Sequence, residues 1–161
     1  MNQTHIHLLI NHLPVFGSIL GGLVLAHGLW TKNNQTKVAA YYVLIISSIG
    51  AVIAYLTGEA AEEAVENIQG ISKTMLDQHE DAAVFALVAL IVLGVASLIG
   101  LFLTIKKSPF IRTMAFVTLF ISLISFGIIA RVGYLGGQIR HTELNSATPT
   151  QQQEGGQEDD D

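Results

Sequence analysis

Four long runs of apolar residues dominate the chain, separated by short polar segments. They are Leu13–Trp30, Val38–Leu56, Ala82–Ile105 and Thr113–Ala130, and His27 is the only strongly polar side chain inside them. Each run is about as long as the ~20 apolar residues that an α-helix needs to cross a bilayer. A helix of a water-soluble bundle would show a polar face, which these runs lack. The pattern predicts an all-α integral membrane protein, an antiparallel four-helix bundle.

Basic residues in the two short connections predict the orientation. The loops Thr31–Lys37 and Lys106–Arg112 join consecutive spans on one side, and they carry Lys32, Lys37, Lys106, Lys107 and Arg112. By the positive-inside rule this side is cytoplasmic. The N-terminus, the long Gly58–Asp81 connection and the C-terminal tail then lie outside, where all 13 acidic residues fall. We expect an N-out, C-out topology with the functional face on the outer side of the membrane.

The composition agrees with a membrane domain and excludes several classes of site. Half of the 161 residues are hydrophobic, 13% are charged, and the mean hydropathy is +0.49. The absence of cysteine excludes disulfides and thiolate metal sites, and no basic patch with interleaved aromatics supports nucleic-acid binding. No removable signal peptide is expected. We expect residues 1–144 to form the four-helix transmembrane domain and residues 145–161 to form a disordered acidic tail.

The long outer connection carries a patterned set of acids. Four glutamates follow the spacing i, i+3, i+4 and i+7, which gathers them on one helical face: Glu59, Glu62, Glu63 and Glu66. The second helix therefore continues outside the bilayer for ~2–3 turns, towards a stop at Gly70. Ser72 can then cap a helix that leads through His79 into the third span. The simplest interpretation of the glutamates is a solvated, negatively charged helix end.

Three of the six histidines come at the start of the first apolar run: His5, His7 and His12. On a continuous helix, His5 and His12 differ by about 20° in azimuth, whereas His7 points about 200° from His5. Pro14 removes a hydrogen bond, so the helix either kinks there or begins there. In the second case Asn11 is the cap, and His5 and His7 lie on an extended or interfacial segment.

Counting residues from the basic loops gives the depth of the polar groups. His12, Glu59 and Arg131 lie near one level at the outer edge of the hydrocarbon, and His5 and His79 lie roughly ten ångströms further out. Arg131 either reaches to the interface or pairs with Glu59 or a haem propionate.

His27 lies ~22 Å below His12, and no other helix offers a histidine at that depth. We interpret His27 as an interfacial residue near Trp30. At most one bis-histidine haem therefore fits.

Several of these residues together resemble a known family. The pattern comprises His7, His12-Leu13-Pro14, Thr57-Gly58, His79 and Gly136-Gly137-Gln138. It resembles a family of uncharacterised bacterial four-span membrane proteins with a histidine–apolar–proline motif at the start of the first helix. In that family the domain occurs beside, or fused to, cytochrome c-type modules. The resemblance implies periplasmic electron transfer and haem b binding. This chain has no CxxCH haem-attachment site, so a c-type cytochrome would be a separate partner.

The leading functional hypothesis is a small b-type cytochrome or electron-transfer subunit with one haem b at the outer side. Neutral imidazoles suit haem iron, and bundles build such sites from facing helices. His12 and His79 are the expected axial pair, and His5 or His7 could replace His12. The candidates to hold the propionates stand at the outer end of the fourth helix: Arg131, Arg140 and His141.

Two other hypotheses remain open. One is a non-haem metal site for zinc, iron or manganese, built from His5, His12, His79, Glu59, Glu62 and Glu63. The other is a structural accessory subunit of a respiratory complex without a cofactor, since glycines along the spans permit close helix contacts within the bundle or with another protein. An enzyme is the least favoured class, because no nucleophile–base pair and no phosphate loop is visible.

Overall fold

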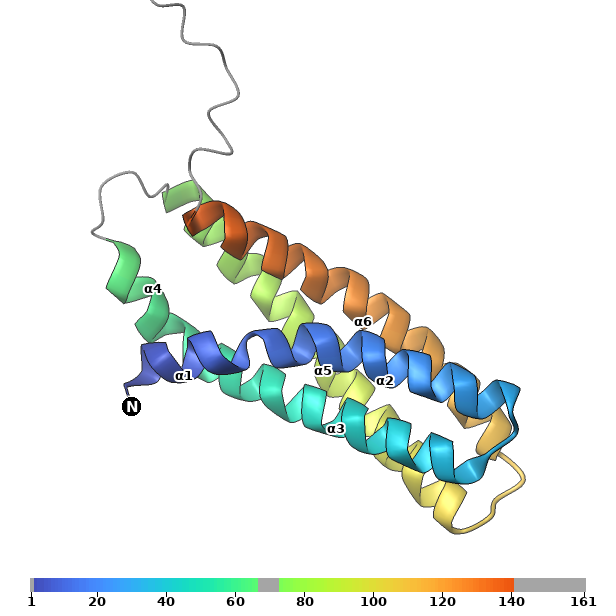
Figure 1. Cartoon of the computed structure of the whole chain (residues 1–161). Helices are drawn as coiled ribbons and strands as arrows, with labels where there is room; N and C mark the ends of the chain where they lie inside the picture. Colours follow the sequence, from blue (N-terminus) through green and yellow to red (C-terminus); the bar gives the residue numbers. More distant parts are fainter. Residues whose placement is uncertain (1, 67–72, 141–161) are drawn as a thin grey trace, which may run out of the picture.

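The computed structural model describes residues 2–66 and 73–140 of the chain. These residues form six α-helices (Figure 1): α1 (Gln3–Ile10), α2 (His12–Trp30), α3 (Asn34–Leu56), α4 (Gly58–Glu66), α5 (Lys73–Ile105) and α6 (Ile111–Arg140). The four apolar runs lie within α2, α3, α5 and α6, and three of them end at the last residue of their helix: Trp30, Leu56 and Ile105. The predicted all-α architecture is confirmed.

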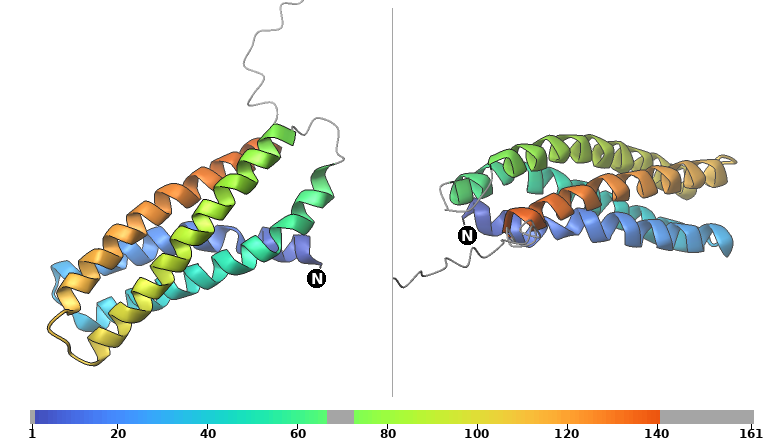
Figure 2. Two further views of the ribbon diagram at one scale, coloured as in Figure 1. Left: turned by 180° about the vertical axis from the view of Figure 1, so that it is seen from behind. Right: turned by 90° about the horizontal axis from the view of Figure 1, so that it is seen from above.

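The four long helices form a bundle in which each packs against two neighbours. Helix α2 contacts α3 and α6, and α5 contacts the same two helices from the other side. The α2–α3 and α5–α6 turns lie together at one end, which we call the hairpin end, and α1 and α4 lie at the other, which we call the histidine end (Figures 1 and 2). Consecutive long helices are therefore antiparallel, as predicted.

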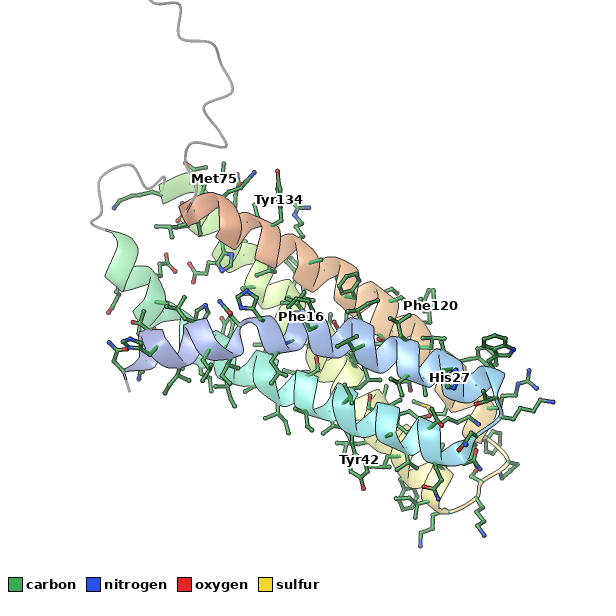
Figure 3. The ribbon with its side chains drawn as sticks, viewed as in Figure 1. Phe16, His27, Tyr42, Met75, Phe120 and Tyr134 are labelled. Carbon is green, nitrogen blue, oxygen red and sulfur yellow. The ribbon has the colours of Figure 1, made fainter. Side chains whose placement is uncertain are left out.

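All four long helices are long and apolar enough to cross a membrane. Between 28% and 39% of the apolar segment of each is buried inside the bundle, so most large side chains face outward. Tyr42, Phe120 and Tyr134, for example, are more than half exposed and point away from the bundle (Figure 3). An apolar surface on this scale is unusual for a soluble protein and fits a lipid bilayer.

The bundle interior contains many small and hydroxyl-bearing residues. Buried serines on α3 and α6 donate to backbone carbonyls of a neighbouring helix and so connect every adjacent pair of long helices. These bonds are Ser47 Oγ to Pro14 O (3.2 Å), Ser48 Oγ to Leu90 O (2.6 Å), Ser122 Oγ to Ser18 O (2.7 Å) and Ser125 Oγ to Ala89 O (3.2 Å). Interhelical hydrogen bonds of this kind contribute about 0.6 kcal/mol each on average.

Glycines allow the helices to approach closely at these contacts. A Cβ added at Gly17 would lie 2.7 Å from Ser47 Cβ, and one added at Gly22 would lie 2.7 Å from Ser122 Oγ. Both distances are too short for real atoms. By contrast, a Cβ at Gly127 would meet no atom within 4 Å. Most glycines of the long helices thus serve contacts within the bundle, whereas Gly127, Gly133 and Gly137 of α6 do not.

A lysine occupies a left-handed backbone conformation in each hairpin turn. Lys32 has φ 55° and Lys107 has φ 53°. The Lys32 N–H donates to Leu29 O (3.4 Å) and the Asn33 N–H to Gly28 O (3.0 Å), which is the Schellman pattern that ends many helices. The same two bonds recur around Lys107. Glycine is the usual residue at such a position because it lacks the steric penalty.

The break between α1 and α2 falls at Asn11, three residues before Pro14. Proline has no N–H, so the Ile10 carbonyl loses its helical partner and the chain is interrupted there. Asn11 occupies the N-cap position of α2 but makes no side-chain capping bond. The residues before it form the helix α1, so His5 and His7 are helical and do not lie on an extended segment.

The predicted extension of the second helix is present as a separate helix, α4. Helix α3 ends at Leu56, and Thr57 turns its hydroxyl back to Ile53 O (2.8 Å). Helix α4 then begins at Gly58 and packs against α1. The expected stop at Gly70, the cap at Ser72 and the tail at 145–161 lie outside the described residues.

Candidate functional site

Three of the histidines have exposed side chains that point away from any shared pocket. His5 and His12 lie on the surface of α1 and α2, where the His12 ring stacks on Phe16 with 6.4 Å between centroids. His27 is exposed at the hairpin end and meets Trp30 edge-on, also at 6.4 Å (Figure 3). The expected nearness of His27 to Trp30 is confirmed.

His7 and His79 are the two partly buried histidines at the histidine end. On α1, His7 Nδ1 lies 2.8 Å from Ala54 O of α3. On α5, His79 Nδ1 lies 3.1 Å from Val132 O of α6. Each ring therefore connects its own helix to a neighbouring one. Burial lowers the pKa of His79, the hydrogen bond to Val132 O raises it, and the charge of His7 lowers it.

The bonding partners decide which tautomer each ring adopts. A backbone carbonyl can only accept a hydrogen bond, so Nδ1 of His7 and of His79 must carry the proton and donate it. In the neutral ring the lone pair then sits on Nε2. Metal-binding imidazoles are commonly held this way, with one nitrogen bonded to a carbonyl and the other on the metal.

A glycine lies against each of these rings. A Cβ added at Gly136 would lie 3.1 Å from His79 Cε1, and one added at Gly58 would lie 3.7 Å from His7 Cε1. The first distance is tighter than an ordinary contact, whereas the second is normal. Both glycines lie along the Cε1–Nδ1 edge of the ring, the edge that faces the accepting carbonyl, so Nε2 is on the side away from them.

Asn11 adds an unsatisfied acceptor on the His7 side of the site. Its backbone N–H donates to His7 O (2.9 Å), so it follows His7 by one helical turn on the same face. Its side-chain Oδ1 is buried and has no hydrogen-bond partner among the described residues. A buried acceptor without a donor costs about 1–3 kcal/mol, and a bound water or ligand would remove that cost.

The residues proposed for a non-haem metal do not come together. Within residues 2–66 and 73–140, no three His, Asp or Glu side chains gather closely enough to hold a metal ion. The reason is that these residues lie on helices with different neighbours. Helix α4, which carries Glu59, Glu62 and Glu63, packs against α1, whereas α5, which carries His79, packs against α3 and α6. The two remaining candidates, His5 and His12, are exposed on α1 and α2.

The arginines considered for ion pairing are at the end of α6. The Arg131 side chain is exposed, as is that of Glu59, and no ion pair joins them in the part of the chain that is described. Arg131 directly precedes Val132, whose carbonyl accepts from His79. Arg140 is the last residue of α6; its side chain and His141 lie outside the described part.

The structure changes the ranking among the candidate histidines. The azimuths of a continuous helix placed His5 and His12 on one face, yet both are exposed, and His7 is the one that is partly buried and bonded to Ala54 O. The signal that could have found it was already visible, since His7, Gly58, His79 and Gly136 all belong to the pattern that carries the family resemblance. The structure places each of these histidines beside one of these glycines.

Comparison of the chain with protein-family models, with curated proteins and with solved structures found no match.

Proposed function

We propose that the chain is a small electron-transfer subunit of the bacterial inner membrane that holds one haem b at its histidine end. His7 and His79 are the proposed axial ligands. The observation that carries the proposal is their shared geometry: two partly buried imidazoles at the same end of the bundle, from α1 and α5, each anchored through Nδ1 to a carbonyl, each with Nε2 left for a ligand.

The number of ligands favours haem over a bare metal ion. A structural or catalytic zinc site takes three or four protein ligands, and no group of three is present in the described residues. In a haem the porphyrin nitrogens occupy four positions, so two imidazoles complete the iron coordination. A haem bound there would supply a one-electron redox couple.

The residues around the pair would orient and anchor the group. The carbonyls of Ala54 and Val132 hold the two rings in one tautomer and one orientation, and Gly58 and Gly136 lie against the Cε1–Nδ1 edges of the rings, away from Nε2. Arg131, exposed next to Val132, could pair with a propionate. The buried Asn11 Oδ1 offers an acceptor for a water at the edge of the site.

The charge of the histidine end supports a redox partner of opposite sign. The acids Glu59, Glu63, Asp77, Glu80 and Asp81 all lie on α4 or the first turns of α5 and are exposed. Such a surface would guide a positively charged partner during encounter. With this end facing the periplasm, as the basic hairpins predict, the c-type cytochrome implied by the family resemblance would be that partner.

Absorption spectra of the purified protein test the proposal. After expression in a haem-replete host, we expect a Soret band and the reduced spectrum of a low-spin, bis-histidine haem. His7→Ala and His79→Ala should each abolish the low-spin spectrum, and His7→Gly should recover it with added imidazole, which fills the vacated ligand position. His12→Ala and His27→Ala, which alter exposed rings, are the matched controls.

Two results would overturn the assignment. One is a wild-type protein without a Soret band from such a host. The other is loss of the low-spin spectrum in His12→Ala with retention in His7→Ala.

One observation favours a cofactor-free alternative. Because both rings already donate to carbonyls of neighbouring helices, they could serve only to hold α1 on α3 and α5 on α6, as in a structural accessory subunit. In that case His7→Ala and His79→Ala would lower thermal stability in a protein that shows no haem spectrum. Co-purification of a stoichiometric membrane partner would support this second role.

A further inference from the structure

A groove lies at the hairpin end, the opposite end of the bundle from the histidine site. It has a volume of about 410 Å³ and runs between α2 and α6. Its walls are mostly apolar, and two cations stand at its edge. The lining residues are Ala26, Leu29, Trp30, Lys32, Arg112, Phe116 and Leu119.

The two cations of the groove have no acidic neighbour in the sequence. The chain contains no Asp or Glu from residue 1 to 58 or from 82 to 142, so both turns of the hairpin end are purely basic. Lys32 is exposed, and the Arg112 guanidinium lies 5.7 Å from the centre of the Phe116 ring. Each is thus available to an anion at the groove.

The position of Lys32 is itself unusual. It adopts φ 55° in the turn after α2, where glycine would fit with less strain. Lys107 adopts the same conformation in the other turn but does not line the groove. The two lysines therefore form a natural pair for comparison, equal in charge and backbone conformation.

We propose that this groove binds one anionic phospholipid of the leaflet that faces the hairpin end. Lys32 and Arg112 bind the headgroup phosphate, to which a guanidinium can donate two hydrogen bonds. An acyl chain follows Leu29, Phe116 and Leu119 into the bilayer, and Trp30, 84% exposed at this end, lies at headgroup level as interfacial tryptophans do. Basic pockets between transmembrane helices bind anionic headgroups in this manner.

The apolar walls distinguish a lipid from a free phosphate. A soluble anion would need only the two cations, whereas Ala26, Leu29 and Leu119 continue the groove as an apolar surface below them. A chain of methylene groups covers such a surface favourably. The whole groove therefore fits a molecule with one charged and one apolar part.

Native mass spectrometry of the full chain in detergent tests the proposal. The protein is titrated with phosphatidylglycerol and, separately, with phosphatidylcholine of the same acyl chains. We expect preferential retention of phosphatidylglycerol, and an affinity about fivefold lower in Lys32→Gln and in Arg112→Gln, the loss that corresponds to one cation near a headgroup. Lys107→Gln should bind as the wild type does.

A second variant tests the apolar part of the groove. Ala26→Phe fills the space between α2 and α6 without changing any charge, so we expect it to lose phosphatidylglycerol retention. Equal losses in Lys107→Gln and Lys32→Gln would show diffuse surface charge and overturn the proposal. So would equal retention of the two lipids, unchanged binding in Ala26→Phe, or displacement of the lipid by millimolar glycerophosphoglycerol, which would indicate a site for the soluble phosphate.

Discussion

The chemical state of His7 and of His79 cannot be inferred from the position of the residue along its own helix. Both rings use Nδ1 on a carbonyl of another helix, at 2.8 Å and 3.1 Å. The choice of tautomer, and hence the nitrogen left for a ligand, depends on backbone atoms of α3 and α6. Pro14 contributes indirectly, because it interrupts the helix after Ile10 and separates α1 from α2. The directions of side chains on α1 therefore no longer follow from those on α2.

The glycines beside the two rings give a residue-scale prediction that rests on the proposed haem site. In Gly136→Ala the new Cβ would lie 3.1 Å from His79 Cε1 and displace the ring, whereas in Gly58→Ala the 3.7 Å distance to His7 Cε1 is an ordinary contact. We expect haem affinity to fall about tenfold in Gly136→Ala, the effect of roughly 1.4 kcal/mol of overpacking. Haem titration followed at the Soret band measures it.

Gly58→Ala is the control, since it adds the same methyl group and should bind haem within about twofold of the wild type. An equal loss in both variants would mean that the glycines serve the helix contacts and not the rings.

At the scale of the elements, α2 and α6 are held together by small residues and hydroxyls. Ser122 Oγ donates to Ser18 O at 2.7 Å, and Gly22 leaves room for that hydroxyl. The neighbouring contacts of α3 and α5 use the same combination of serine and glycine. In lipid the apolar outer surface gives no drive for helices to associate, so close packing and these hydrogen bonds carry the stability of the bundle.

A Gly22→Ala substitution tests this contact. The added Cβ would lie 2.7 Å from Ser122 Oγ, which forces α2 and α6 apart or breaks the bond to Ser18, so we expect a loss of about 1–3 kcal/mol. Gly127→Ala has no atom within 4 Å of the new methyl and should be neutral or more stable by up to about 1 kcal/mol, the helix-propensity gain. Thermal unfolding in one detergent compares them; a less stable Gly127→Ala would contradict the explanation.

At the scale of the whole molecule, the two ends of the bundle differ in charge and in chemistry. The hairpin end is basic and carries the lipid groove, and the histidine end is acidic and carries the imidazole pair. Both hairpin turns lie at the same end (Figure 1), so all the basic loop residues face one side of the membrane. This asymmetry predicts a single orientation, with the histidine end outside.

Cysteine labelling tests the orientation, because the chain contains no native cysteine. Gln3→Cys and Glu63→Cys place an exposed thiol at the histidine end, and Gln35→Cys places one at the hairpin end. In spheroplasts, an impermeant maleimide should label the first two nearly completely and the third only after lysis. The reverse pattern would put the proposed haem site in the cytoplasm and remove the case for a periplasmic partner.

The sequence alone predicted four apolar helices long enough to cross a membrane and their antiparallel order, but not that α1 and α4 are separate helices. The apolar runs ending at Trp30 and Ile105 match the ends of α2 and α5, and the helical spacing of Glu59 to Glu66 correctly predicted α4. These are properties of consecutive residues. The polarity and length of a run decide whether it can cross a bilayer. The loops Thr31–Lys37 and Lys106–Arg112 are so short that the helices they join must be antiparallel.

Only the tertiary structure decided which side chains meet. That His7 rather than His12 is partly buried at the histidine end depends on the break at Asn11 and on the packing of α1 against α4 and α3. That Lys32 and Arg112 border one groove depends on α2 and α6, distant in sequence, being neighbours. The physical reason is that periodicity gives the direction of a side chain relative to its own helix axis, whereas a site requires the rotation and crossing of several helices, which their contacts at glycine and serine establish.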